Sequence, residues 1–185
     1  MSERRAIKCV AVGDGAVGKT SLLISYSTGQ FPSDYVPTVF ESYAVDVDIG
    51  GRTWTLGLFD TAGQEGFDHV RTLSYHKTDV FLVCFSLVND ASYHNVRELW
   101  VRDIRRNSPR CPIVLVGTQL DLRSASDRPV VTHEMGRRLG CRIKAAKYVE
   151  CSAMTGENVN TVFQEVILAA TQHNRSKLNS ACDLL

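Results

Sequence analysis

Residues Gly13 to Thr20 combine the side chains and the spacing of a phosphate-binding loop. They read Gly-Asp-Gly-Ala-Val-Gly-Lys-Thr, which fits the pattern G-x-x-x-x-G-K-[ST]. The glycines allow backbone N–H groups to close around phosphate oxygens, and the following helix directs its positive N-terminal end at the same charge. Lys19 would reach the β- and γ-phosphates, and Thr20 would place its hydroxyl on Mg²⁺. A plain glycine turn beside a solvated lysine explains the glycines but not the Lys-Thr pair at this offset.

A second group of polar residues follows the apolar run that ends at Phe59, and it reads Asp60-Thr61-Ala62-Gly63-Gln64-Glu65. An aspartate at the carboxyl end of a parallel strand, next to a phosphate loop, is well placed to hold the water shell of Mg²⁺. Gly63 could donate its backbone N–H to a γ-phosphate, and Gln64 could orient an attacking water. The alternative for Asp60 is the cap of a turn or helix.

The segment from Phe31 to Tyr43 shows no helical or strand periodicity at its start. Thr38 within it would coordinate Mg²⁺ and contact a γ-phosphate only while that phosphate is present. We expect the segment to be ordered by a triphosphate and released on hydrolysis. A plain surface loop is the alternative.

Two further motifs select a base. Gly117-Thr118-Gln119-Leu120-Asp121 and Glu150-Cys151-Ser152-Ala153 each follow an apolar strand. The Asp121 carboxylate can accept from both N1–H and the 2-amino group of guanine, a match that adenine cannot make. A backbone N–H at Ser152 or Ala153 would meet guanine O6. Together the motifs favour a guanine nucleotide.

Strands and helices alternate along the chain, which predicts a mostly parallel sheet with helices on both faces. We expect strands over 7–12, 43–49, 52–59, 80–86, 113–116 and 147–151, and helices over 19–26, 91–106, 133–139 and 159–173. Alternating residues before Gly50-Gly51 predict a hairpin, so one edge of the sheet should be antiparallel. The continuous apolar runs at 82–85 and 113–116 indicate strands covered on both faces.

The composition is that of one ordinary globular domain. Of 185 residues, 44% are apolar and 22% charged, and the formal net charge of +1 offers no field for nucleic acid. Six cysteines occur without a C-x-x-C pair, which favours reduced packing residues of a cytosolic protein. We expect neither a signal peptide nor a membrane-spanning segment.

These five elements in this order resemble a small GTPase of the Ras superfamily. The segments most similar to its Rho family, including Rac proteins, are 36–40, 55–65, 73–75 and 78–86. Those most similar to the cell-division-control branch are 49–51, 56–59, 118–119 and 148–151. The resemblance implies a P-loop GTP-binding (G) domain over 1–174, an α/β fold with a six-stranded sheet, and a flexible tail over 175–185.

The resemblance also implies a switch that hydrolyses GTP to GDP slowly without an activating protein. Its catalytic residues would be Gln64, Lys19 and Gly15, and its Mg²⁺ ligands Thr20, Thr38 and, through water, Asp60. The nucleotide would contact Gly13, Asp14, Gly15, Ala16, Val17, Gly18, Lys19, Thr20, Ser21, Phe31, Tyr35, Thr38, Asp60, Gly63, Gln64, Thr118, Gln119, Asp121, Ser152 and Ala153. Effectors would bind Tyr35, Val36, Pro37, Thr38, Val39, Phe40, Glu41, Ser42 and Tyr43.

Four departures from the family pattern stand out. Gln119 replaces the lysine of most small GTPases, although the nearest branch also has glutamine. Glu41-Ser42 stands where close relatives have Asp-Asn, so partner choice could change. Residues 66–71 correspond to the segment called the second switch in this family. Compared with relatives, they lack an acid, a phenol hydroxyl and an arginine. Residues 123–132 are too short for the charged helix that Rho proteins insert, so we expect a loop running straight into the helix at His133.

The C-terminal residues Cys182-Asp183-Leu184-Leu185 fit the prenylation motif C-a-a-X, and the final Leu favours a geranylgeranyl chain on Cys182. Asp183 is awkward at an aliphatic position, and an unmodified polar tail is the alternative. One lipid chain gives only marginal membrane binding, and Arg175 and Lys177 are the only bases near it. We expect a monomer on the cytoplasmic face of the plasma membrane or of internal membranes. Its partners would be an exchange factor, an activating protein, effectors and a prenyl-binding chaperone.

Two other functions remain open. A P-loop kinase or ATPase of small metabolites shares the phosphate loop but has no use for the base motifs. A non-hydrolysing, GTP-bound scaffold is opposed by Gly15 and Gln64, since scaffold-type relatives usually replace one of them.

Overall fold

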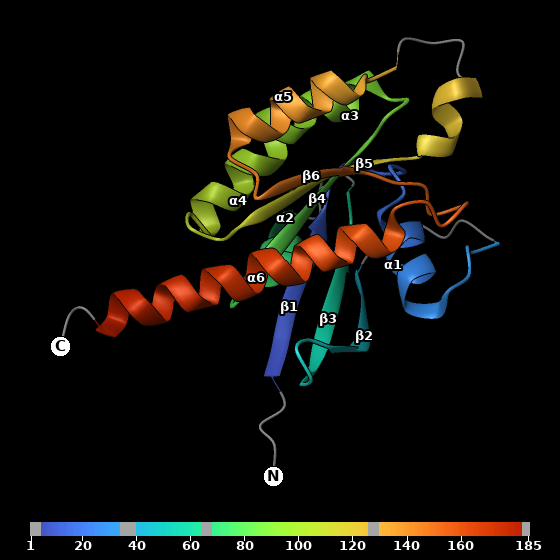
Figure 1. The fold of residues 1–185 in the computed structure, drawn as a ribbon. Helices are drawn as coiled ribbons and strands as arrows, with labels where there is room; N and C mark the ends of the chain where they lie inside the picture. Colours follow the sequence, from blue (N-terminus) through green and yellow to red (C-terminus); the bar gives the residue numbers. More distant parts are fainter. Residues whose placement is uncertain (1–4, 34–39, 64–67, 126–129, 183–185) are drawn as a thin grey trace.

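The strands of this chain form one six-stranded sheet surrounded by helices (Figure 1). The computed structural model describes residues 5–33, 40–63, 68–125 and 130–182. The strands are β1 (Arg5–Val12), β2 (Phe40–Asp48), β3 (Thr53–Thr61), β4 (Val80–Ser86), β5 (Ile113–Thr118) and β6 (Lys147–Glu150). Their order is β2-β3-β1-β4-β5-β6, and every neighbouring pair is parallel except β2 with β3. The predicted α/β fold with an antiparallel edge strand is confirmed.

The antiparallel edge is the predicted hairpin around two glycines. Gly50 and Gly51 both have left-handed backbones, with φ of 61° and 73°. Two such residues in succession give a turn whose twist matches that of the strands. The Ile49 N–H donates to the Arg52 carbonyl over 2.8 Å and closes the turn.

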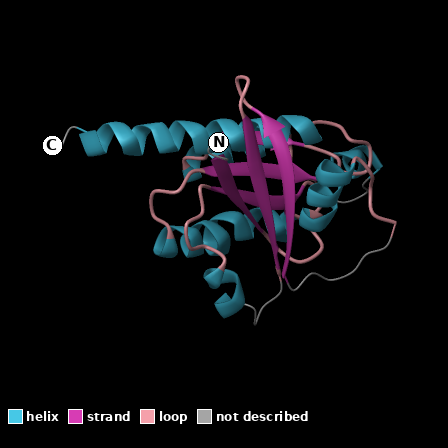
Figure 2. Cartoon of the chain, turned by 90° about the horizontal axis from the view of Figure 1, so that it is seen from below, coloured by secondary structure: helices cyan, strands magenta, loops and turns pink. Residues whose placement is uncertain are grey.

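Helices cover both faces of the sheet (Figure 2). On one face lie α1 (Lys19–Thr28) and α6 (Val159–Cys182). On the other lie α3 (Asp90–Asn95), a π-helical segment η1 (Val96–Val101), α4 (Arg102–Asn107) and α5 (His133–Ile143), with α2 (Asp68–Leu73) beside η1. The central strands β4 and β5 are buried along their whole length, as expected for strands covered on both sides.

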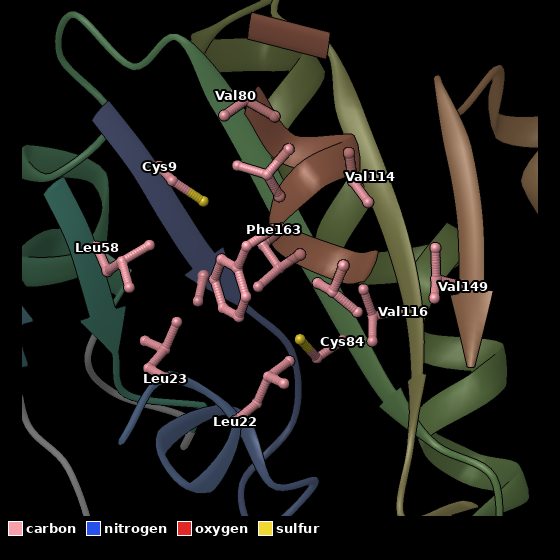
Figure 3. Close-up of a cluster of buried hydrophobic side chains, with 14 of the residues drawn as sticks. Cys9, Leu22, Leu23, Leu58, Val80, Cys84, Val114, Val116, Val149 and Phe163 are labelled. Atoms are coloured by element: carbon pink, nitrogen blue, oxygen red, sulfur yellow. The ribbon is translucent and has the colours of Figure 1, made fainter. Parts of the chain in front are cut away.

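The sheet therefore separates two hydrophobic cores. In the first, Phe163 of α6 lies among side chains of the central strands (Figure 3), and its ring stacks on Tyr26 of α1 at 3.8 Å between centroids. In the second, Phe81 and Phe85 of β4 pack against Trp100 of η1. Burying each such large side chain contributes about 1.5–3 kcal/mol. Packing in these two cores holds the strands in place, and with them the carboxyl ends of the strands from which the site residues extend.

Several predicted boundaries are wrong. The helix expected over 91–106 is interrupted by the π-helical segment η1, and α5 and α6 run beyond their predicted ends. Helix α2 and the 3-10 helix η2 (Leu120–Ala125) were not predicted. The predicted direct loop over 123–132 is tested only in part: 123–125 belong to the 3-10 helix η2, 130–132 carry no helix, and 126–129 lie outside the description.

None of the helices in the described part of the chain is long and apolar enough to span a bilayer. The five cysteines whose side chains the structure describes carry free thiols, and all of them except Cys141 are buried. Burial raises the pKa of the Cys84 thiol to about 12, which keeps it protonated and unreactive. The predicted packing role is confirmed for the buried four.

Candidate functional site

The phosphate loop connects the end of β1 to the start of α1, and its shape depends on Gly13. This residue has φ of 145°, and a Cβ atom there would lie 2.2 Å from the Cys84 carbonyl oxygen of β4. Only glycine permits both the backbone conformation and the close approach. The loop is thus held tightly against the sheet, and α1 begins at Lys19 immediately after it.

Lys19 is buried beneath this loop, with 6% of its surface exposed. Its Nζ donates to the carbonyls of Gly13 and Asp14 over 2.8 and 2.7 Å. Burial lowers the pKa of the ammonium, while the nearby Asp60 carboxylate opposes that shift. The charge is therefore fixed inside the curve of the loop, where phosphate oxygens would replace carbonyls as its acceptors.

Thr20 and Asp60 meet at the mouth of the loop. The Thr20 hydroxyl donates to Asp60 Oδ2 over 2.5 Å, and Asp60, near the end of β3, is fully buried. A hydroxyl and a carboxylate are oxygen donors of the kind that Mg²⁺ takes, alongside water and phosphate. The residues present thus fit the predicted Mg²⁺ site, for which Thr38 lies outside the described residues.

Gly63 brings the end of β3 against the phosphate loop. A Cβ at this position would lie 2.3 Å from the Gly13 carbonyl oxygen and 2.4 Å from the Asp14 carbonyl carbon. No side chain fits between the two segments. The predicted donation of the Gly63 N–H to a terminal phosphate stays a prediction, and the structure places this residue against the phosphate loop.

The Asp14 side chain points away from the loop's interior and joins it to the helices on the second face. Its two carboxylate oxygens accept from Asn95 Nδ2 and Trp100 Nε1, each over 2.7 Å. The Arg71 guanidinium of α2 lies over the Trp100 ring, 4.7 Å from its centroid, and pairs with Asp103 at 3.6 Å. No sequence pattern predicted roles for Asn95, Trp100 or Arg71, because their contacts join segments more than twenty residues apart.

A pocket of about 160 Å³ opens beside the phosphate loop. It is lined by Gly18, Ser21, Leu22, Phe31, Thr118, Gln119, Asp121, Leu122, Cys151, Ala153 and Met154. These residues come from both predicted base motifs, from α1 and from the segment that contains Phe31. The structure therefore brings the base motifs together with the phosphate loop in one site.

The walls of this pocket are tied to one another by side-chain hydrogen bonds. Thr118 Oγ1 bonds the carbonyls of Val17 and Phe85 over 2.5 and 2.9 Å, which joins the base motif to the phosphate loop. The Gln119 amide accepts from the Ser86 hydroxyl. The Ser152 hydroxyl, which is fully buried, donates to Asp121 Oδ1 over 2.5 Å. The Asp121 carboxylate is thereby oriented before any base arrives.

An ion pair behind the pocket supports both base motifs. Arg123 of η2 donates to both carboxylate oxygens of Glu150 over 2.8 and 2.6 Å, and Tyr148 donates to the same carboxylate over 2.7 Å. Arg123 also donates to the Val131 carbonyl over 3.1 Å. Because Glu150 is the first residue of the second base motif and Arg123 follows the first motif, the pair fixes the spacing between them. Sequence spacing alone did not reveal this pair.

Some predicted site residues fall outside the description. These are Gln64 and five members of the effector segment, Tyr35, Val36, Pro37, Thr38 and Val39. The remaining effector residues, Phe40 to Tyr43, lie at the start of the edge strand β2, where Phe40, Glu41 and Ser42 are exposed. Gly15 and Ala16 lie exposed in the phosphate loop, and the backbone of Cys182 forms the last residue of α6.

A strand, a glycine loop over a buried lysine and a helix, at the carboxyl edge of a parallel sheet, define a P-loop nucleotide-binding protein. A sequence model of the Ras family matches residues 8–172, so the chain belongs to the Ras family. Members of this family are small GTPase switches that bind GTP or GDP with Mg²⁺ and work with exchange factors, activating proteins and effectors. The matched region contains every predicted nucleotide-binding residue.

Proposed function

We propose that this chain is a Rho-like switch that binds guanine nucleotides and hydrolyses GTP to GDP and phosphate. The observation that carries the proposal is the junction of two preformed parts. The Asp121 carboxylate, held by Ser152, lies in a pocket bounded by Gly18 of the phosphate loop, and Lys19 is buried directly after that glycine. A base and its phosphates therefore have adjacent places.

The chain's own residues act by positioning and charge. Lys19 and the loop N–H groups stabilise negative charge on the phosphates, and Thr20 and, through water, Asp60 would hold Mg²⁺, which would supply further neutralisation of phosphate charge. Gln64 follows Gly63 directly and orients the attacking water. Asp121 accepts from guanine, and the Arg123–Glu150 pair keeps the two base motifs at the required spacing.

Hydrolysis is slow in the isolated chain, because we find no arginine in a position to act as an internal finger among the described residues. An activating protein that supplies one would add roughly 10³ to 10⁵ in rate. In the GTP state the segment around Thr38 recruits effectors together with the exposed residues of β2. The output belongs to actin organisation, polarity or membrane traffic.

The protein attaches to membranes through a lipid on Cys182. A geranylgeranyl chain there attaches the protein reversibly to the cytoplasmic face of the plasma membrane or of internal membranes. The motif Cys182-Asp183-Leu184-Leu185 supports this proposal. A shift of the protein from the membrane to the soluble fraction of cells on Cys182→Ser is the expected result, and an unchanged distribution would contradict it.

Base specificity is tested by competition. Unlabelled GTP and GDP should displace labelled GDP, while ATP should not. In Asp121→Asn an amide N–H replaces an acceptor, so guanine should bind weakly and xanthine nucleotides, whose C2 carries an oxygen, should bind instead. ATP competing as well as GTP would overturn the guanine assignment in favour of a P-loop kinase or ATPase.

Hydrolysis is tested by single-turnover release of phosphate from bound GTP. The wild type should release phosphate, and Gln64→Leu and Gly15→Val should remain in the GTP state with and without an activating protein. No release from the wild type over hours, even with an activating protein, would identify a GTP-bound scaffold. Unchanged release in Gly15→Val would refute the placement of Gly15 beside the reacting groups.

A further inference from the structure

A second hollow, unrelated to the nucleotide site, lies where η1 and α4 face the C-terminal end of α5. It is an open depression of about 530 Å³, and its lining includes Arg97, Arg102, Arg105, Arg142, Lys144 and Glu98. We call it the basic hollow. Five of its residues are basic and one is acidic, in a chain whose formal net charge is only +1.

Most of this positive charge is not neutralised by neighbours. Glu98 pairs with Arg97 at 3.4 Å. Within the residues that the structure describes, Arg102, Arg142 and Lys144 form no ion pair, and all three are exposed. Arg105 donates to the Cys111 carbonyl over 2.6 Å, a neutral acceptor that fixes the guanidinium without cancelling its charge.

Compensation of the helix dipoles explains only part of this charge. The carbonyl end of α5, at Ile143 and Lys144, lies at the hollow, and such a helix end carries about half a negative charge. This end offsets roughly half a positive charge. Five basic side chains against one carboxylate leave an excess well beyond that. The excess makes the basic hollow a site for an anion.

The position of the hollow indicates which anion. In a parallel sheet the helices return antiparallel to the strands, so α4 and α5 end near the strand starts, at the edge opposite the nucleotide site. Helix α6 begins after β6 and runs back in the same direction. Figure 1 shows α4, the end of α5 and the last turns of α6 on the same side of the molecule.

We propose that the basic hollow binds the phosphorylated headgroups of an anionic membrane. Only the role of the hollow as a second membrane signal rests on the proposed lipid at Cys182; binding of headgroups by the hollow does not. One lipid chain alone attaches a protein marginally, and a basic patch is the kind of second signal that makes attachment stable. With the hollow on a bilayer, the end of α6 faces the same bilayer and the nucleotide site faces away from it.

The test uses the full, unlipidated chain loaded with GDP, so that it does not depend on Cys182. Sedimentation is measured with vesicles of phosphatidylcholine alone and of phosphatidylcholine with phosphatidylinositol bisphosphate. The variant of the basic hollow, called the hollow variant, is Arg142→Gln/Lys144→Asn. The matched control is Arg52→Gln/Lys77→Asn, which also removes two exposed charges outside the hollow. Lys77 and Lys144 both have left-handed backbones, with φ of 54° and 55°, which asparagine tolerates.

The wild type and the control should bind the phosphoinositide vesicles and not the neutral ones. Each basic residue near an anionic surface is worth about a fivefold change in binding, so the hollow variant should bind roughly 25-fold more weakly. Binding should also fall as salt rises. Retained GDP binding in every protein shows that the fold and the nucleotide site are intact.

Equal binding of the phosphoinositide vesicles by the hollow variant and the control would overturn the proposal. So would a wild type that ignores both kinds of vesicle while still binding GDP, a result that leaves the switch function standing. Soluble inositol hexakisphosphate separates the lipid from a free phosphate ligand. If the hollow binds this compound, with the same dependence on Arg142 and Lys144, but binds no bilayer, the assignment to lipid is wrong. Loss of GDP binding in the wild type would instead count against the proposed function.

Discussion

At the scale of single residues, the site depends on positions where no other side chain is tolerated. Gly13 and Gly63 let two backbone segments and a carbonyl of β4 come within van der Waals contact. Lys19, Thr20 and Asp60 owe their positions to this contact, because the loop that carries or faces them is held against the sheet. Their types and spacing predicted the phosphate loop, and the structure brings the two predicted Mg²⁺ donors Thr20 and Asp60 into contact.

Gly13→Ala should abolish nucleotide binding and lower the free energy of unfolding. The new Cβ would overlap the Cys84 carbonyl, and a left-handed backbone costs a side chain about 1–2 kcal/mol in addition. Gly29→Ala is the control, since Gly29 has φ of 73° but nothing within 4 Å of a Cβ. Urea unfolding and GDP binding measure both effects. Similar losses in the two variants would show that strain alone, and not the close approach, explains the glycine.

At the scale of elements, the π-helical segment η1 supports the phosphate loop through a hydrogen bond to Asp14. Trp100, which is 1% exposed, donates its indole N–H to Asp14, and the Arg71 guanidinium lies over its ring. Irregular turns of this kind occur at functional sites, where they direct a side chain that a regular helix would place elsewhere. A shift of α2 would reach the loop through Arg71, Trp100 and Asp14.

A double-mutant cycle tests this support. Trp100→Phe removes the donor and Asp14→Ala removes the acceptor, and each should lower the free energy of unfolding. The two losses should overlap by about 1–3 kcal/mol, because the hydrogen bond to a half-buried charge disappears in either variant. Strictly additive losses would show that Trp100 acts only by filling space. GDP dissociation should be faster in both single variants.

The Glu150 carboxylate should give stability a pH dependence. Burial opposes its charge, but hydrogen bonds from Arg123 and Tyr148 outweigh burial and hold its pKa below the ordinary value of 4.5. A folded-state pKa below the unfolded one contributes stability that is fully present above about pH 4.5 and is lost as the pH falls through the folded value. The base motifs are therefore best supported at neutral pH.

Glu150→Gln should lower the free energy of unfolding at neutral pH by about 1–3 kcal/mol, since Arg123 loses its charged partner. The difference from the wild type should shrink in acid. Glu134→Gln is the control on α5: hydrogen bonds from Arg137 and Arg138 hold its pKa at about 2, but the group is exposed and should matter far less. Urea unfolding at several pH values decides. A constant difference at every pH would contradict the linkage.

The elements that the sequence missed share physical reasons. Helix α5 continues past Leu139 because Gly136 and Gly140 serve close packing: a Cβ at Gly136 would lie 2.0 Å from the Tyr148 hydroxyl. Glycine in a helix usually suggests an end, so the prediction stopped early. Helix α6 contains neither Gly nor Pro between Val159 and Cys182, so no residue in the sequence marks its end, and the predicted end at 173 was too early. The short helices α2 and η2 carry too few residues for a periodic pattern.

The candidate site was predicted where local motifs suffice and missed where distant segments meet. The base pocket follows from two motifs at strand ends, since parallel strands bring such ends to one edge. The Arg123–Glu150 pair and the Asn95–Asp14–Trp100 contacts require knowledge of which helices lie beside which loops. Tertiary packing decides that, and no spacing in the sequence reports it.

At the scale of the whole molecule, the sheet divides into a protected centre and an open edge. Strands β4 and β5 are buried throughout, while β2 has only one neighbour and no fully buried residue. Amide hydrogen exchange should therefore be slowest in β4 and β5 and fastest, among the strands, in β2. Mass spectrometry of digested protein measures the order. Amides of β2 as protected as those of β4 would indicate that the edge is covered in solution.

The strand order also has a consequence for synthesis of the chain. Strand β1 pairs with β3 and β4, so the first strand made finds its partners only once residue 61 and then residue 86 are available. At about 5–20 residues per second, its apolar residues wait several seconds on the ribosome without a sheet. Assembly of the phosphate loop waits as well, because the Cys84 carbonyl against which Gly13 rests belongs to β4. Translation must thus pass nearly half of the chain before its first motif can take shape.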